Sequence, residues 1–512
     1  MKMMSPADMQ RMDKTAINDY KIPGILLMEH AANSIFIYLK ENKKIDDVCI
    51  ICGPGNNGGD GLALARLLTM AKCKNLKVLL LAGEDKLSED GLIYFNICKQ
   101  LNIRIDILAD DNKEELIKYI DQSETVVDAI FGTGLKREVT NIYKEVIESI
   151  NMSTSHIVSV DIPSGIDGET GKVQGVAVLA DKTITFVLPK KGLYLYPALL
   201  YTGDVKVVDI GMPPKVIEES ETNMYSIEES EMKKLVPKRS MRSNKGTYGK
   251  VLVIGGSRGM SGAVTLTSLA AYKSGCGIVT AAVPSSLVDI IESKLTEVMS
   301  YELPEKDGHL EKKTVKILKE LIKKYDVIAI GPGIGRDNAI KDILIEVLAS
   351  DKPCIIDADG LFYLNEVEDI LKNRMADTII TPHPGEMSKL TGYSIGQILD
   401  DPVKIAINYS KKQNVITVLK LERIVISDTL GNIYINRYGN TGAAKGGSGD
   451  VLTGIIAGLM AQCKNAIDSA VVGSFVHARA GEMAASDLSS YSMMPSDLIE
   501  HMSVIFKKLE CM

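Results

Sequence analysis

The hydrophobic pattern alternates between short apolar runs and longer segments with a helical period. The runs Asp47–Cys52, Lys77–Ala82 and Glu124–Ile130 have the length and composition of buried strands. Helical periodicity follows such runs, as in Leu62–Met70 and Leu92–Leu101. Strands that alternate with helices predict βαβ units, with a parallel sheet covered by helices.

The same alternation returns in the second half of the chain. Apolar strands are predicted at Lys250–Ile254, Ile328–Ile330, Cys354–Ile356 and Val415–Lys420, with a helix over about Ser261–Lys273. A length of 512 residues also favours two cores over one. We therefore predict an α/β protein with two doubly wound domains.

The two ends of the first half are marked by local signals. Ser5 and Pro6 open a helix, with Asp8 placed to complete a capping box. After the first half, Met212–Pro214 interrupts a strand, and an acidic run follows. The predicted organisation is a first domain over 1–215, a linker over 216–225 and a second domain over 226–512.

Charge, aromatic content and hydropathy argue against several classes of function. A net charge of −7, an isoelectric point near 5.6 and an aromatic content of 5% argue against nucleic-acid binding. We see no signal peptide and no stretch long and apolar enough to span a membrane, so we expect a cytoplasmic protein that binds no membrane. Cys49 and Cys52 form a CxxC inside a predicted strand, on opposite faces, which favours core cysteines over a metal site.

The stretch Asn440–Gly454, NTGAAKGGSGDVLTG, carries the strongest chemical signal. Glycines surround one acid, Asp450, and an apolar helical pattern starts directly after it. Glycines let backbone N–H groups approach an anion, and a helix N-terminus adds partial positive charge. A carboxylate beside such a site can take a proton from a hydroxyl that attacks a phosphate. The alternative is a glycine-rich turn in which Asp450 only caps the helix.

A second glycine loop, GPGNNGGDG at Gly53–Gly61, follows the first strand. It contains the GxGxxG pattern, which is weak by itself. Asn56, Asn57 and Asp60 add amides and a carboxylate, which suit a phosphate together with a small cation. A solvent-exposed turn is the alternative.

Later strands of the first half also end in acids. Asp128 ends one strand, and Asp161 with Ser164 follows the next. Because ligands of open parallel sheets bind where the carboxyl ends of the strands meet, we expect these groups near Asn57 and Asp60. Their oxygen atoms suit a hard cation.

These motifs carry a family resemblance. GPGNNGGDG, VDAIFGTGL and SVDIPSGIDG resemble the NAD(P)H-hydrate epimerases, over roughly residues 1–215. The resemblance implies a Rossmann-like domain, with K⁺ held by Asn57, Asp128 and Ser164 and with Asp161 as acid–base residue. The substrate contacts that it implies are Asn56, Asn57, Gly58, Gly59, Asp60, Gly132, Thr133, Gly134, Leu135, Lys136, Arg137 and Glu138.

The second half resembles another family. GGSGD before a helix is similar to ribokinase-like kinases, and GPGIG, DADGL, TPHPGE and NTGAAKGGSGDVLTG narrow this to the ADP- or ATP-dependent NAD(P)H-hydrate dehydratases. The resemblance implies that Gly333 and His383 contact the hydrate and that Asp450 acts as base. His383 could instead be a simple turn histidine. The implied nucleotide contacts, with Mg²⁺ accompanying ADP, are Lys420, Gly446, Gly447, Ser448 and Gly449.

One position departs from the family pattern. The family usually has Gly after the phosphate-binding lysine, whereas Leu421 follows Lys420 here, which puts the local loop in doubt. The two resemblances together imply a repair enzyme that epimerises hydrated NAD(P)H and dehydrates the S-epimer with ADP, releasing AMP and phosphate. We also expect a homo-oligomer.

Three other function classes fit parts of the sequence. A small-molecule kinase would leave a stable phosphorylated product, and a nucleotide sensor or scaffold would bind without turnover. An NAD-dependent dehydrogenase is weaker: Glu84 after the second strand could bind a ribose, but no hydride-transfer constellation is evident.

Overall fold

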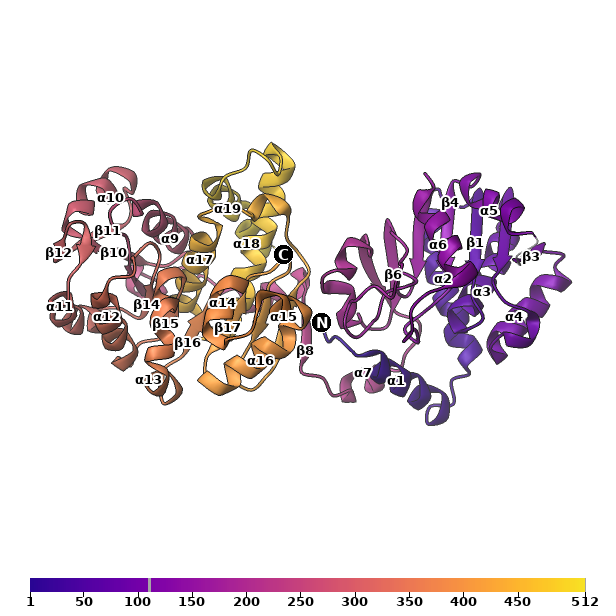
Figure 1. Cartoon of the computed structure of the whole chain (residues 1–512), viewed down its shortest axis with the longest axis horizontal. Coiled ribbons are helices and arrows are strands. Elements are labelled where there is room, and N and C mark those ends of the chain that lie inside the picture. The colour runs from indigo at the N-terminus through magenta and orange to yellow at the C-terminus, as the bar shows by residue number, and fades with distance from the viewer. Residues whose placement is uncertain (109–111, 512) are drawn as a thin grey trace. The chain divides into compact units, whose positions relative to one another are not determined.

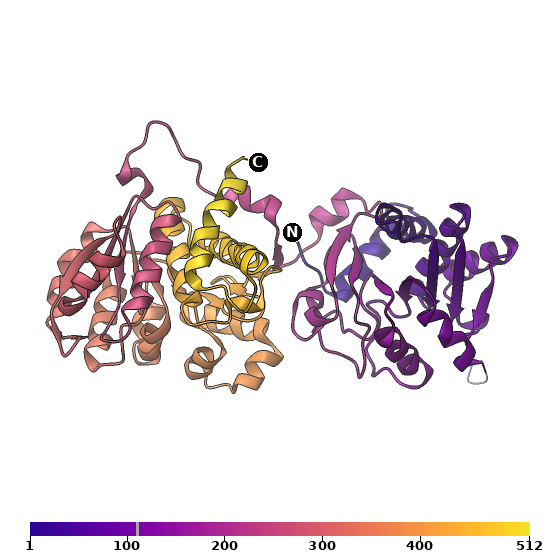
Figure 2. The ribbon, with the colours of Figure 1, turned by 90° about the horizontal axis from the view of Figure 1, so that it is seen from above.

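The computed structural model describes residues 1–108 and 112–511. The chain forms two compact units, one of Lys2–Met224 and one of Met1 with Tyr225–Met512. In each unit a sheet lies between layers of helices (Figure 1 and Figure 2). The predicted α/β class is confirmed.

The N-terminal unit is built on a seven-stranded parallel sheet in the order β3-β2-β1-β4-β5-β6-β7. The order reverses between β1 and β4, so the carboxyl ends of these two strands flank the topological switch point, where ligands of such sheets bind. The strands are β1 Asp47–Cys52, β2 Asn75–Leu80, β3 Ile105–Ile107, β4 Thr125–Ala129, β5 His156–Val160, β6 Lys182–Phe186 and β7 Asp204–Val208.

Helices pack on the faces of this sheet. One face buries Cys49, Ile51 and Val126 under α5 and α6, whereas α2, α3 and α4 pack against one another on the other face. Ser5 caps α1 through the predicted capping box with Asp8. The helices are α1 Pro6–Asn18, α2 Gly24–Glu41, α3 Asn56–Met70, α4 Glu89–Gln100, α5 Lys113–Asp121, α6 Asn141–Met152 and α7 Pro214–Glu219.

One helix boundary differs from the prediction. The helix predicted from Leu62 begins at Asn56, so the glycine loop is helical from Asn56 onward. Glycine disfavours helices by about 1 kcal/mol, which is why the pattern favoured a loop. Packing explains the glycines: a Cβ on Gly58 would lie 1.9 Å from the Gly53 oxygen, and one on Gly59 would lie 2.6 Å from Met28 Cε.

The C-terminal unit contains a ten-stranded sheet in the order β11-β10-β9-β14-β15-β16-β17-β18-β19-β8. It is parallel from β11 to β17, and β17, β18 and β19 pair antiparallel. Here the switch point lies between β9 and β14. The strands are β8 Met224–Ile227, β9 Lys250–Ile254, β10 Ile278–Pro284, β11 Met299–Leu303, β14 Val327–Ile330, β15 Cys354–Ile356, β16 Thr378–Ile380, β17 Ile416–Leu419, β18 Val425–Ser427 and β19 Ile433–Asn436; β12 Glu305–Lys306 and β13 His309–Leu310 form a separate hairpin.

Helix α17 is the buried centre of this unit. Its packing against α9 depends on two glycines, because a Cβ on Gly454 would lie 2.2 Å from the Thr267 oxygen and one on Gly458 2.3 Å from the Ala271 oxygen. The helices on the same face as α17 are α8 Glu229–Leu235, α9 Ser261–Lys273, α10 Val288–Lys294, α17 Ser448–Cys463, α18 Ala466–Leu488 and α19 Pro495–Cys511. The remaining helices are α11 Thr314–Leu321, α12 Asn338–Ala349, α13 Glu368–Lys372, α14 Pro384–Thr391, α15 Ile395–Asp400 and α16 Pro402–Gln413.

Two expected absences can be compared with the described part of the chain. Within 1–108 and 112–511, no helix is long and apolar enough to cross a membrane, and no group of three or more His, Cys, Asp or Glu is arranged to hold a metal ion. Cys49 and Cys52 are buried on opposite faces of β1, as predicted, with Cys52 Sγ beside Gly61 of α3.

Candidate active sites

A cavity of about 730 Å³ lies at the switch point of the N-terminal sheet. The start of α3 forms one wall, and the loop after β4 forms another. Asp161 enters from the end of β5. The predicted site residues that line this cavity are Asn56, Asn57, Asp60, Gly132, Thr133, Gly134, Leu135, Lys136, Arg137 and Asp161.

The other predicted residues of this site lie outside the cavity wall. Gly58 and Gly59 serve the close packing of α3 described above. Glu138 lies beside Gly175, where an added Cβ would be 2.8 Å from Glu138 Cγ. Gly58 and Gly59 therefore have structural explanations that require no ligand.

Asp161 is held in an unusual backbone conformation. Its φ of 65° lies in the left-handed region, which a residue other than glycine enters at an energetic cost, and such strain clusters at functional sites. Its Oδ1 accepts hydrogen bonds from Thr185 Oγ1 at 3.0 Å, from the Phe186 N–H at 3.2 Å and from Lys190 Nζ at 2.5 Å. The Lys190 side chain is only 2% exposed. This buried ion pair fixes the carboxylate at the cavity wall.

Asp128 and Ser164 form a buried polar pair behind the loop after β4. Asp128 is fully buried and accepts hydrogen bonds from Ser159 Oγ at 2.8 Å, from the Ser164 N–H at 2.9 Å and from Ser164 Oγ at 2.5 Å. Burial raises the pKa of Asp128, and these hydrogen bonds oppose the shift. A buried carboxylate whose hydrogen bonds come from neutral groups is a favourable environment for a cation.

The sequence did not reveal one wall of the cavity. Gln10, Asp13 and Ile17 of α1 line it, as do Leu27 and Met28 of α2. The α1 helix was predicted as an element from its capping signals. Nothing in a single helical pattern shows which ligand cavity a face will meet, so these side chains could not be placed.

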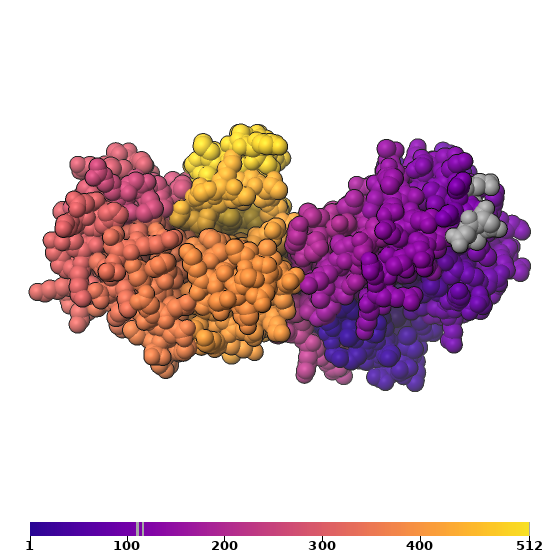
Figure 3. All heavy atoms as spheres, in the orientation of Figure 1, coloured from indigo at the N-terminus to yellow at the C-terminus, as the bar shows by residue number. Residues whose placement is uncertain are grey.

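The second candidate site lies at the N-terminus of α17. Gly447, with φ of 101°, precedes the helix, and Asp450 lies in its first turn, as the pattern predicted. Burial, with a smaller contribution from the charge of Asp357, raises the pKa of Asp450 to about 7, against the opposing charge of Lys420. The surface of this unit is hollowed between the orange and yellow segments (Figure 3).

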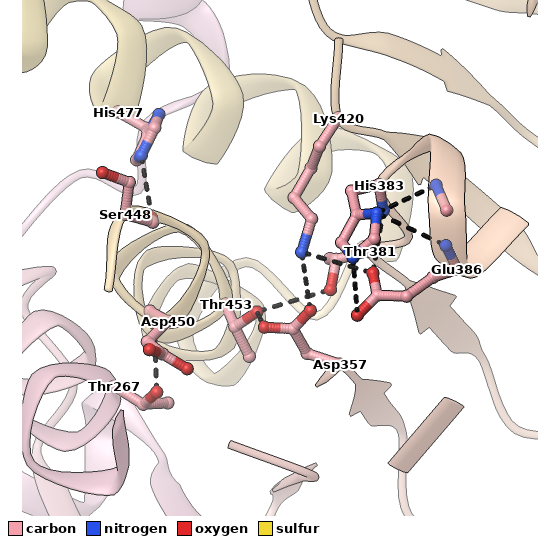
Figure 4. Close-up of polar contacts among 11 residues, drawn as sticks. Thr267, Asp357, Thr381, His383, Glu386, Lys420, Ser448, Asp450, Thr453 and His477 are labelled. Carbon is pink, nitrogen blue, oxygen red and sulfur yellow. Dashed lines mark hydrogen bonds and ion pairs between the residues drawn. The ribbon is translucent and has the colours of Figure 1, made fainter. Parts of the chain in front are cut away.

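A buried ion pair lies beside this helix start (Figure 4). Lys420 Nζ donates to Asp357 Oδ1 at 2.8 Å, and Thr453 Oγ1 of α17 donates to Asp357 Oδ2 at 2.8 Å. Burial opposes ionisation of Asp357, but Lys420 outweighs it and holds the pKa of Asp357 below its usual range. A Cβ on Gly449 would lie 3.1 Å from Lys420 Nζ, so the ammonium is adjacent to the amide-rich first turn.

The TPHPGE segment, at the start of α14, forms another part of the second candidate site, beside Lys420. His383 is the N-cap of α14, and its Nδ1 accepts from the Gly385 and Glu386 N–H groups at 2.9 and 3.3 Å. Glu386 Oε2 accepts from the His383 N–H and lies 4.0 Å from Lys420 Nζ. Burial raises the pKa of Glu386, with Lys420 opposing. His383 is thus a capping residue; its side chain is 56% exposed, and its Nε2 lies 3.6 Å from Glu386 Oε1.

The remaining predicted residues lie around the same sheet edge. Gly333, in the loop after β14, accepts a hydrogen bond from Ser257 Oγ at 2.8 Å through its carbonyl, and its φ is 61°. The Ser448 carbonyl oxygen accepts a hydrogen bond from buried His477 Nε2 at 3.0 Å, and burial lowers the pKa of His477 to about 4. His477 is therefore a neutral support for the start of α17. Gly446 has open space around its Cα.

Comparison with known proteins agrees with this arrangement. The family model described as NAD(P)H-hydrate dehydratase matches residues 251–503, and the model described as YjeF-related protein N-terminus matches residues 25–192. A bifunctional NAD(P)H-hydrate repair enzyme from Moorella thermoacetica is 37% identical, covering 100% of this chain and 97% of its own. The chain belongs to this family. The Escherichia coli K12 enzyme of the same name is 34% identical, covering 88% of this chain and 83% of its own.

A solved structure supports the fold of the second unit. The crystal structure of ADP/ATP-dependent NAD(P)H-hydrate dehydratase from Bacillus subtilis, co-crystallised with ATP and Mg²⁺, has 28% sequence identity and a TM-score of 0.50. It covers 57% of this chain and is itself covered completely. The predicted ribokinase-like class is therefore confirmed, and the family match decides against the kinase, sensor and dehydrogenase alternatives.

Proposed function

We propose that the N-terminal unit interconverts the R and S epimers of hydrated NAD(P)H and that the C-terminal unit dehydrates the S-epimer with ADP, releasing AMP and phosphate. Residues 1–215 would be the epimerase domain, 226–512 the dehydratase domain and 216–225 the linker. The observation that carries the dehydratase assignment is Asp450, a carboxyl with a pKa near neutrality in the first turn of α17 beside Lys420. The cavity at the β1/β4 switch point supports the epimerase assignment.

Asp450 takes the hydroxyl proton of the S-epimer. The hydroxyl oxygen then bonds to the terminal phosphorus of ADP while the bond to AMP breaks. A pKa near 7 suits this task, because such a base is ionised at working pH yet basic enough to accept a proton. Phosphate leaves from C6 with the C–O bonding electrons, C5 loses a proton, and the ring double bond is restored.

The start of α17 and Lys420 bind the phosphates. The backbone N–H groups of Gly446, Gly447 and Gly449 at a helix start favour an anion, whereas the Ser448 N–H donates to the Lys445 oxygen at 3.2 Å. Lys420 is held in place by Asp357 even though Leu421 replaces the usual glycine, because its position depends on the ion pair and on its backbone N–H, which donates to the Pro382 oxygen at 2.9 Å. Mg²⁺ bound to the nucleotide would neutralise developing phosphate charge.

Asn57, Asp128 and Ser164 would hold K⁺ in the epimerase unit. Their donor atoms are an amide, a carboxylate and a hydroxyl oxygen, which suit a hard cation, and Asp128 is a fully buried carboxylate with neutral hydrogen-bond donors. The cation would supply positive charge at the loop that lines the cavity. Replacing K⁺ by tetramethylammonium should then slow epimerisation while dehydration of the S-epimer continues.

The decisive experiment uses a prepared mixture of both hydrated NADH epimers with Mg²⁺, and follows the recovery of near-ultraviolet absorbance. The wild type should recover all of the NADH, Asp450→Asn none, and Asp161→Asn should slow recovery from the R-epimer only. Parallel reactions with ADP and ATP measure the nucleotide preference. No recovery by the wild type with either nucleotide would refute the proposal. Homo-oligomer formation and the cytoplasmic location stay predictions.

A further inference from the structure

Asp13 is the unexplained acid of the N-terminal cavity. It lies on α1 between Gln10 and Ile17, and these three positions form one helical face that lines the cavity. The neighbouring face of the helix buries Met9 and Met12 in the core. Core packing therefore fixes α1 so that the carboxyl of Asp13 is presented to whatever occupies the cavity.

Asp13 has no hydrogen-bond or ion-pair partner among the described residues, although its side chain is half-buried. Lys190 is a buried cation whose charge lowers the pKa of Asp13, but it does not provide a hydrogen bond. Its ammonium donates to Asp161 Oδ1, to Thr185 Oγ1 at 3.0 Å and to the Phe186 oxygen at 3.2 Å, which uses all three of its hydrogens. The interaction between Asp13 and Lys190 is therefore a longer-range electrostatic one, without a hydrogen bond.

Acidic side chains gather around the buried ammonium of Lys190. Asp60 is buried, and burial, with the charges of Asp161 and Asp13, raises its pKa well above the usual range. Burial, opposed by Lys190 and assisted by Asp161, raises the pKa of Asp13 to about 6. Asp161 alone is hydrogen-bonded to the ammonium. The charged side chains around the cavity are Asp13, Asp60, Asp90, Lys136, Arg137, Asp161 and Lys190.

We propose that Asp13 is a second catalytic acid–base residue of the epimerase site and that it works together with Asp161. This rests on the epimerase activity assigned above. Inversion at C6 requires one bond to C6 to break and to form again on the other face, with one proton given and one taken. A single carboxyl fixed at one wall cannot serve both sides of the ring at once, whereas carboxyls from α1 and from the end of β5 can.

The proposed step balances as follows. Asp13, protonated, gives its proton to the C6 hydroxyl; the C6–O bond breaks, water leaves with the bonding pair, and the N1 lone pair forms an N1=C6 double bond. Water then adds to the opposite face of C6, the double-bond pair returns to N1, and Asp161 takes the released proton. The reverse direction exchanges the two roles, so the chain needs no external oxidant or reductant.

The test measures epimerisation of the R-epimer in the full-length chain, with dehydration of pure S-epimer as an internal control. Asp13→Asn should lower kcat for epimerisation by at least about a hundredfold, change KM by less than about threefold, and leave dehydration unchanged. Asp13→Glu should recover part of the rate with a shifted pH profile. Lys14→Gln, an exposed charge change on the same helix, should behave as wild type.

Two results would overturn the proposal. One is an Asp13→Asn chain that epimerises with wild-type kcat and an unchanged pH profile. The other is a loss that Asp13→Glu fails to restore although both variants melt as the wild type does. In water enriched in ¹⁸O, the wild type should place label at C6 as fast as it epimerises; epimerisation without label would refute the C–O step. A wild type that dehydrates but never epimerises would instead refute the assigned epimerase activity.

Discussion

Asp450→Asn should abolish dehydration and, at the same time, stabilise the C-terminal unit. The pKa of Asp450 is raised from 3.8 to about 7, chiefly by burial. The folded state therefore binds this proton more tightly than the unfolded chain does, so the free energy of unfolding falls as pH rises from about 4 to about 7. Above that range the carboxylate is ionised and desolvated in the folded unit, and the free energy of unfolding is lowered by the full cost of that desolvation.

The magnitude follows from the two pKa values. They differ by about 3, which corresponds to roughly 4 kcal/mol at about 1.4 kcal/mol for each pKa unit. The helix N-terminus favours the anion by about 0.3–1 kcal/mol, and partial solvent access reduces the penalty further. We expect Asp450→Asn to raise the free energy of unfolding of the C-terminal unit by about 2–4 kcal/mol at about pH 8. The increase should be clearly smaller at about pH 5.

Calorimetry at both pH values measures this gain. For a unit of this size, about 1 kcal/mol raises the melting temperature by roughly 2 °C, so the C-terminal transition should rise by roughly 4–8 °C at about pH 8. Asp401→Asn is the matched control: Asp401 caps α16 from the surface, and Asn caps equally well. An Asp450→Asn chain that is less stable, or that gains the same amount at both pH values, would show that Asp450 is not a desolvated base.

Three further outcomes follow from the same structure. The kcat/KM of dehydration should fall about tenfold for each pH unit below about 7 as Asp450 is protonated, and Glu386→Gln, which removes a nearby negative charge, should move this decline to lower pH in a pH–rate profile. Gly454→Ala would place a Cβ 2.2 Å from the Thr267 oxygen and should destabilise the unit by about 1–3 kcal/mol in urea titrations, whereas Gly446→Ala, in open space, should change stability by less than about 0.5 kcal/mol. ADP with Mg²⁺ at about a hundredfold its Kd should stabilise only the C-terminal transition, by about 2.7 kcal/mol, as seen by calorimetry.

Much of the architecture was predictable because buried parallel strands are continuous apolar runs. Asp47–Cys52 and Lys250–Ile254 were placed at their observed bounds. The start of α3 at Asn56 was not, because glycines required by tertiary contacts disfavour a helix locally. The antiparallel end of the second sheet, from β17 to β19, also has no local signature that separates it from further parallel strands.

The candidate sites were predictable where chemistry is concentrated in one loop. Asp450 stood out because glycines and a helix start surround it in sequence. Asp357 and Lys420 are 63 residues apart and meet only through the order of the strands, so their ion pair could not be read from the chain. Asp13 was missed for a related reason, since its significance depends on a cavity built by other elements.

The candidate sites of the two units share one arrangement of charged side chains. At each candidate site a lysine ammonium is hydrogen-bonded to one aspartate: Lys190 to Asp161, and Lys420 to Asp357. Each also contains a second aspartate that the lysine does not reach, and burial raises the pKa of that second group to about 6 for Asp13 and to about 7 for Asp450. The lysine charge is largely neutralised by the aspartate that is hydrogen-bonded to it. The second aspartate therefore keeps a raised pKa and can exchange a proton near neutral pH. A lysine-to-methionine change at either site should therefore move the pKa of the unpaired aspartate upward, a shift that NMR titration of the carboxyl carbons would detect.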